Sequence, residues 1–211
     1  MVKDKITLEQ IMGLLDSCYT AALNGLPNTP SAEDLAHQYL EKYKEPQKAI
    51  YKLVNAQIMK CSTSGFITGL GGIITLPVAI PANVGSVMYV QVRMIAAIAV
   101  IGGYNPHDDE VQTLVYMCLA GMSVGDIFKQ AGVQFGNKFT TAMIKKIPGT
   151  VLTKINQKVG FRFITKFGEK GLINLGKMVP AVGGIIGAGV DYAGTRKIAK
   201  SAYKTFILNI T

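Results

Sequence analysis

The chain has 211 residues, room for one domain or two small ones, and 49% of them are hydrophobic while 17% are charged. This composition excludes an intrinsically disordered protein, which needs low hydrophobicity and high charge. Residues 1–110 hold 8 Lys/Arg and 10 Asp/Glu, whereas residues 111–211 hold 14 and 3. The basic half predicts an anionic partner, either nucleic acid or an acidic membrane surface. Alternatively, the cations only keep a hydrophobic protein in solution.

The first half of the chain is rich in helix signals. Thr7 and Gln10 have the spacing of a capping box, and Ser31 is placed to cap a second helix over residues 32–44. Pro46 suits the first turn of a third helix. We expect residues 1–45 to form a helical appendage to a larger helical domain over residues 46–211.

Residues 61–92 contain no charged side chain, which raises the question of a membrane span. Pro77 and Pro81 divide the run, and the piece over residues 65–76 would reach only ~18 Å as a helix, short of the ~30 Å hydrocarbon core. The piece over residues 82–101 is long enough but carries Arg93. We therefore predict buried helices. The alternative is a membrane-inserting, pore-forming-like effector that uses the apolar hairpin over residues 65–101.

The second half also favours helices. Asn105-Pro106 is typical of a helix start, Pro148-Gly149 marks the boundary of a basic segment over residues 151–175, and Pro180 is expected to begin a last helix toward Leu208. Residues 159–165 alternate like a strand, but four apolar residues of this segment recur every fourth position, which favours a helix. These residues are Ile155, Val159, Phe163 and Phe167. The predicted fold class is an all-α multi-helix bundle with buried, glycine-rich apolar helices.

Several glycines lie four residues apart, so each pair would clear one face of a helix and let a neighbouring backbone approach. Two of these pairs are Gly65 with Gly69 and Gly183 with Gly187. We predict that they are helix-packing surfaces. A hairpin that repacks in lipid is the other interpretation.

The sequence offers no recognised catalytic motif. It contains no dinucleotide or phosphate loop and no Gly-x-Ser-x-Gly, and its two histidines, His37 and His107, lack a nearby ligand spacing. We therefore expect no catalytic residues, no metal and no cofactor, and a protein that is not an enzyme. The three cysteines are too few and too widely spaced for a disulfide framework, and residues 1–6 are too charged for a signal peptide. This predicts a cytoplasmic protein, with peripheral attachment to the inner face of the membrane as an option.

Two charges stand alone in apolar sequence. Arg93 is the only charged residue between Lys60 and Asp108, and Asp191 is the only one between Lys177 and Arg196. An unpaired buried charge is costly, so we predict that Arg93 forms a buried ion pair with Asp191 or, failing that, with Asp126. A ligand-binding role for the pair is the alternative.

Five cations recur every fourth residue and form a slanted stripe on the basic helix. They are Lys154, Lys158, Arg162, Lys166 and Lys170. The apolar set that begins at Ile155 follows one position behind them. A helix with cations beside exposed Phe would rest on an anionic membrane surface or bind its lipid. The alternative buries the apolar stripe and leaves the cations solvated. The basic half has no recognised nucleic-acid module, so we predict no specific nucleic-acid partner.

Three stretches carry a family resemblance. Residues 65–81, GFITGLGGIITLPVAIP, residues 92–99, VRMIAAIA, and residues 179–191, VPAVGGIIGAGVD, resemble the EcsC family of bacterial proteins. The similarity covers roughly residues 46–208. The family often has an acidic residue between the two prolines, where this chain has Val78, Ala79 and Ile80.

The resemblance implies a helical protein with no settled activity, from a family named for a neighbour of an ABC transporter linked to secretion. Together with the basic stripe it predicts a non-catalytic, peripheral membrane or lipid-interacting helical protein, linked to secretion or transporter function.

Overall fold

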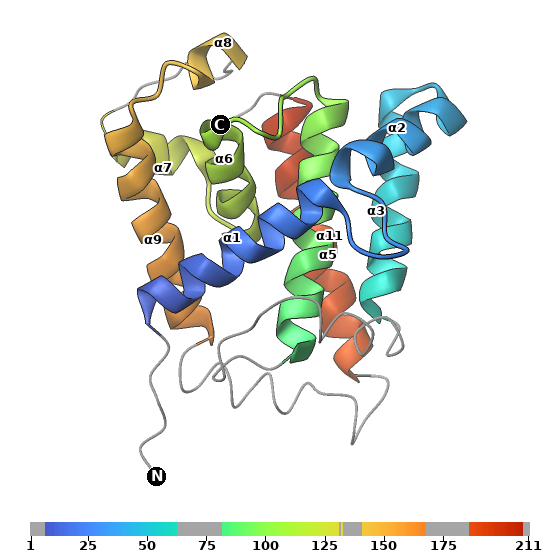
Figure 1. The fold of residues 1–211 in the computed structure, drawn as a ribbon, viewed down its shortest axis with the longest axis horizontal. Helices are drawn as coiled ribbons and strands as arrows, with labels where there is room; N and C mark the ends of the chain where they lie inside the picture. Colours follow the sequence, from blue (N-terminus) through green and yellow to red (C-terminus); the bar gives the residue numbers. More distant parts are fainter. Residues whose placement is uncertain (1–6, 63–81, 131, 133–140, 168–185, 209–211) are drawn as a thin grey trace.

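The predicted all-α class is confirmed by a computed structural model, in which residues 7–62, 82–130, 132, 141–167 and 186–208 are described. Helices account for all the regular secondary structure of these residues apart from one isolated bridge between Leu26 and Thr29 (Figure 1). The helices are α1 (Leu8–Asn24), α2 (Ala32–Tyr43), α3 (Pro46–Ser62), α5 (Ala82–Ile101), α6 (Asp109–Ala120), α7 (Val124–Gln130), α8 (Thr141–Ile144), α9 (Gly149–Phe167) and α11 (Ile186–Phe206).

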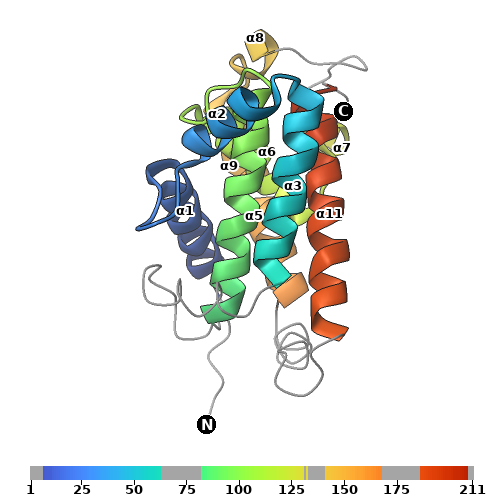
Figure 2. The ribbon, with the colours of Figure 1, turned by 90° about the vertical axis from the view of Figure 1, so that its right-hand side faces the viewer.

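Helix α5 is the centre of the molecule. It packs against α1, α2, α3, α6 and α11, and most of its side chains from Met88 to Ala99 are buried. Helices α3, α5 and α11 run side by side (Figure 2). Helix α9 lies apart from α5 and packs on α1 and α6 (Figure 1). Because α9 and α11 both pack on α6 from different directions, the end of α6 lies between them.

Three predicted helix starts are confirmed by local geometry, whereas α6 begins at Asp109, three residues after the predicted start at Asn105-Pro106. Thr7 and Gln10 form both hydrogen bonds of a capping box at the start of α1. The Ser31 hydroxyl accepts the Asp34 N–H at the start of α2, and α3 begins at Pro46. Residues 159–165 are helical within α9, so the periodicity of four outweighed the alternation. The start of the last helix differs in detail, because α11 begins at Ile186 and residues 180–185 lie outside the described part.

Helices α1 and α2, which lie in the predicted appendage, contribute to the same hydrophobic core as the rest of the chain. Leu14, Leu15 and Cys18 of α1 and Leu35 of α2 are buried in one cluster with the residues of α5 and α6. Tyr19 donates a hydrogen bond to the Pro106 carbonyl, 2.7 Å away, at the approach to α6. These contacts tie the N-terminal helices to the body of the domain.

Close helix packing at glycine is visible at positions other than the predicted pairs. A Cβ atom at Gly102 would collide with the backbone carbonyl of Phe206, and one at Gly160 would collide with the end of the Leu8 side chain. Gly65, Gly69 and Gly183 lie outside the described residues, as does the surrounding of Gly187. Their packing role stays a prediction.

No single helix in the described ranges is both long and apolar enough to cross a membrane. Helices α6 and α7 meet that criterion only as a pair, by length and composition, and they are bent by 116° relative to each other.

Candidate anion-binding groove

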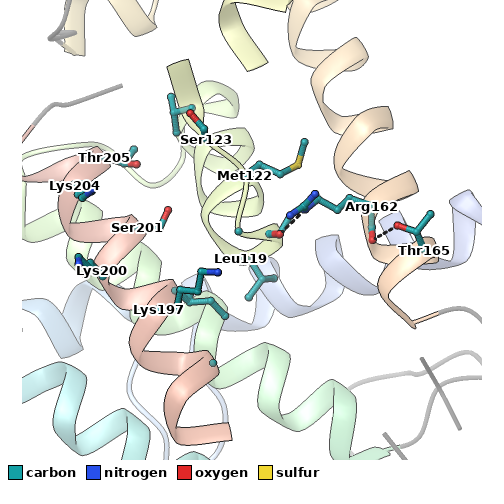
Figure 3. A pocket seen from close by; sticks show the side chains of 15 residues that line it. Leu119, Met122, Ser123, Arg162, Thr165, Lys197, Lys200, Ser201, Lys204 and Thr205 are labelled. Atoms are coloured by element: carbon teal, nitrogen blue, oxygen red, sulfur yellow. Dashed lines mark hydrogen bonds between the residues drawn. The ribbon is translucent and has the colours of Figure 1, made fainter. Parts of the chain in front are cut away.

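A groove of about 830 Å³ opens between α9 and α11, with the end of α6 as its floor (Figure 3). Four cationic side chains line it: Arg162 from α9 and Lys197, Lys200 and Lys204 from α11. Among the described residues that line the groove there is no carboxylate. No acidic side chain of the described lining therefore offsets the positive charge of these four cations. This is the electrostatic pattern of an anion site.

The lysines are on the groove side of α11 because of the helix period. Thr195, Ile198, Ala202 and Phe206 are buried and form the face of α11 that packs into the core. The three lysines recur at spacings of three and four residues, so they share a different face of the same helix. All three are exposed, which keeps them available to a ligand.

Arg162 is held in place by the end of α6. Its Nε donates a hydrogen bond to the Ala120 carbonyl, 2.9 Å away. Gly121 takes a left-handed conformation with φ of 66° and caps the helix, and its N–H and that of Met122 reach back to Cys118 and Met117. A cation near the negative end of the helix dipole is stabilised there. Among the described residues, the Ala120 carbonyl contacts only the Nε of Arg162, so this contact leaves its two terminal nitrogens available to an anion.

Hydroxyl groups complete the polar lining of the groove. Ser123, Thr165, Ser201 and Thr205 contribute side chains to it. Thr205 is buried and accepts a hydrogen bond from the Cys118 thiol at 3.5 Å. Burial raises the pKa of Cys118 to about 11, so this thiol stays protonated at neutral pH. The chemistry that this lining supports is the binding of an anion by ammonium, guanidinium and hydroxyl donors.

The predicted five-cation stripe is divided by the tertiary structure. Lys154 and Lys158 are exposed and line a small hollow of about 260 Å³, where Lys158 donates to the Gln130 side chain of α7 at 3.1 Å. Arg162 belongs to the larger groove. The side chain of Lys166 and all of Lys170 lie outside the described residues, so their part in the stripe stays a prediction.

The apolar stripe is not on the surface as the membrane-resting interpretation required. Ile155, Val159 and Phe163 are at most 1% exposed, because they form the face of α9 that packs on α1 and α6. The alternative that buries this stripe is therefore correct for these three residues, and the Phe167 side chain is outside the described part. Among the described side chains of α9, the exposed ring is Phe161, at 58%, which lines the small hollow with Lys154 and Lys158.

Arg93 is fully buried in α5, as its apolar surroundings in the sequence suggested. Its Nη1 donates to the Pro30 carbonyl at 3.1 Å, and its Nη2 donates to Gln57 Oε1 at 2.9 Å. Its guanidinium also lies 5.4 Å from the centre of the Tyr89 ring. The pKa of Lys60 is lowered by burial and, in second place, by the charge of Arg93. Pro30, Gln57 and Tyr89 are therefore neutral groups in contact with Arg93.

Of the two predicted acids, only Asp126 lies in the part of the chain whose side chains are described. Asp126 is exposed on α7, where its N–H donates to the Ser123 hydroxyl, and no ion pair joins it to Arg93 in the described part of the chain. The side chain of Asp191 lies outside the described residues. Pairing of Arg93 with Asp191 therefore stays a prediction.

The family model for the EcsC protein family matches residues 5–208, nearly the whole chain. The chain belongs to the EcsC family. The match includes α1 and α2 as well as the later helices, so the EcsC similarity extends beyond the stretch over residues 46–208 that the motifs indicated. No curated protein and no solved structure gives a significant match.

The sequence interpretation of this EcsC-family protein missed the lysines of α11. Their signal was present in the chain, since positions 197, 200 and 204 follow the helix period as clearly as the stripe on α9. What the sequence did not contain is their position opposite Arg162. In the described part of the EcsC domain, no three His, Cys, Asp or Glu side chains lie close enough together to hold a metal ion.

Proposed function

We propose that this EcsC-family protein is a non-catalytic protein that binds anionic lipid at a membrane surface, through the groove between α9 and α11. The observation that carries the proposal is the convergence of Arg162 with Lys197, Lys200 and Lys204 on one groove whose described lining has no acid. A lipid phosphate is the anion that a membrane presents at high density, and each cation near such a surface adds ~1 kcal/mol to binding.

The two walls of the groove offer different kinds of cation to a lipid phosphate, an arginine on α9 and lysines on α11. Arg162 offers a planar guanidinium, which binds a phosphate in a fixed geometry, whereas the lysines act as mobile point charges. In Figure 3, Arg162 reaches from α9 and Lys197 from α11 toward the end of α6. Outside the groove, Phe161 lines the small hollow with Lys154 and Lys158 and is an exposed aromatic ring, and aromatic rings favour the interface between headgroups and hydrocarbon.

Insertion of the hairpin over residues 65–101 remains the alternative, with less support. Its second half is α5, which packs against five helices and buries Arg93 together with its hydrogen bonds to Pro30 and Gln57. Insertion would have to take this helix out of the core. A link to secretion or transporter function and a cytoplasmic location are part of the proposal and rest on the sequence.

The test is binding of the purified protein to vesicles of phosphatidylcholine alone and with phosphatidylglycerol, at low and high salt. Binding should require the anionic lipid and weaken with salt. The triple variant Lys197→Glu, Lys200→Glu, Lys204→Glu should lower the affinity at least about 100-fold, from three cations at ~1 kcal/mol each.

A matched control reverses three exposed lysines that do not line the groove, by Lys42→Glu, Lys48→Glu and Lys146→Glu. Its net charge equals that of the groove variant, so it should keep most of the binding. Equal losses in both variants would mean that only the net charge matters. Wild-type protein that ignores anionic vesicles at low salt would contradict the proposal.

A further inference from the structure

A second groove, of about 700 Å³, lies on the other side of α11, between α11 and α3. Its walls are largely apolar, with Ile50 and Val54 from α3 and Ala199 and Tyr203 from α11. Tyr51, 58% exposed, stands at its edge. Ile50 and Ala199 are buried at its base, so the groove reaches down to the core.

Cations stand along the edge of this apolar groove. Arg196, Lys197 and Lys200 all contribute to its lining, together with the uncharged polar side chains of Gln47 and Asn55. Lys197 and Lys200 also line the basic groove between α9 and α11. These two lysines therefore stand between a cationic groove and an apolar one, and each can turn its ammonium group to either side of α11.

We propose that the two grooves bind one molecule of an anionic single-chain amphiphile across α11. Its phosphate headgroup lies at Lys197 and Lys200 on the basic side, and its alkyl chain lies in the groove between α3 and α11. The inference rests on the proposed function and names its ligand class, a phosphate-headed lipid. Both grooves have volumes in the range of small-molecule sites, ~300–1,000 Å³.

The charge pattern favours this occupant over a second copy of the chain. A two-fold dimer would place the same face of α11 against itself. Arg196, Lys197 and Lys200 would then meet the same three cations of the partner, and like charges in contact are costly. An amphiphile instead brings a negative charge to the lysines and an apolar chain to Val54 and Tyr203.

The test is isothermal titration calorimetry of the 211-residue protein with inorganic phosphate, hexyl phosphate and dodecyl phosphate. The two alkyl phosphates are used below their critical micelle concentrations. Each methylene that is fully removed from water tightens binding by about fourfold, from ~0.8 kcal/mol per CH₂. Dodecyl phosphate has six methylenes more than hexyl phosphate. Even with partial burial of these we expect its Kd to be at least about tenfold lower, and inorganic phosphate to bind weakest.

Two variants of α3 locate the chain. Val54 is half-buried in the groove wall, so Val54→Trp fills the groove and should abolish the difference between dodecyl and hexyl phosphate. Met59 is exposed on the same helix and does not line the groove, so Met59→Trp should leave the difference unchanged. Val54→Trp should still bind anionic vesicles, because the basic groove is intact.

The outcomes separate this inference from the proposed function. Vesicle binding without any dependence on alkyl length would overturn the amphiphile site and leave the membrane-surface function in place. Dependence on alkyl length without vesicle binding would contradict the membrane function alone. A dimer in solution that Val54→Trp converts to a monomer would mean that a second copy covers the groove, and would overturn the inference. The series of alkyl lengths on the wild-type protein decides the matter even if Val54→Trp does not fold.

Discussion

The protein holds two arginines in opposite ways. Arg93 is fully buried in α5, and its donors are directed at the Pro30 carbonyl and the Gln57 side chain. Arg162 is exposed on α9 and contacts the Ala120 carbonyl through its Nε alone. Arg93 links three parts of the fold: helix α5, helix α3, and the connection between α1 and α2. Arg162 stands in an open groove with three lysines.

The comparison shows that burial decides whether an arginine serves the stability of the fold or the binding of a ligand. A buried guanidinium is tolerated only when polar groups surround it, so its hydrogen bonds are part of the fold. An exposed guanidinium has water as an exchangeable partner, which an anion can displace. Substitutions in the two regions should therefore affect different measurements.

The largest effect on stability is expected for Arg93→Met. The substitution keeps most of the side-chain length but removes hydrogen bonds to Pro30 and Gln57, and it leaves the Gln57 amide buried. Hydrogen bonds to charged groups contribute ~1.5–3 kcal/mol each, so the free energy of unfolding should fall by about 3–5 kcal/mol. Chemical denaturation with urea measures the loss.

A double-mutant cycle with Asp191→Leu extends this test to the predicted ion pair. If Arg93 and Asp191 are paired, the double variant should recover part of the sum of the two single losses. Strictly additive losses would contradict the pairing and leave the neutral groups as the described partners of Arg93. A fall well below 1 kcal/mol in Arg93→Met would contradict the structural role itself.

An intermediate effect is expected where α5 meets the end of α11. Gly102→Ala places a methyl group against the backbone carbonyl of Phe206, which can move only together with the helix, so we expect a loss of ~1–3 kcal/mol. Gly160→Ala meets the end of the flexible Leu8 side chain, and it also gains up to ~1 kcal/mol of helix propensity. Thermal unfolding should show a clear loss for the first variant and little change for the second. If Gly102→Ala and Gly160→Ala had the same melting temperature, the backbone of α11 at Phe206 would have room for the added methyl group.

The smallest effect on stability belongs to Arg162→Gln. It removes one surface hydrogen bond to the end of α6, for which we expect less than ~1 kcal/mol. Binding to vesicles with anionic lipid should nevertheless weaken about fivefold, from ~1 kcal/mol for one cation. Arg162→Lys keeps the charge and should recover most of the binding. A variant that loses stability as much as Arg93→Met would contradict the division between the two arginines.

The helices were predictable because they depend on local signals. The capping box at Thr7, the cap at Ser31 and the period of four in α9 act within one or two turns, and all three were confirmed. The burial of Arg93 followed from its apolar neighbours in sequence. Its contacts with Pro30 and Gln57 did not, since those residues are 63 and 36 positions away in the chain.

The sequence by itself determined the all-α class, most helix starts and the EcsC resemblance, because periodicity, capping and motifs are written in neighbouring residues. Only the tertiary structure decided which side of each amphipathic helix meets another helix. It buried the apolar stripe of α9 at Ile155, Val159 and Phe163, and it placed Arg162 opposite the lysines of α11. A helix period states that residues share a face, but the partner of that face depends on packing between segments far apart in the chain.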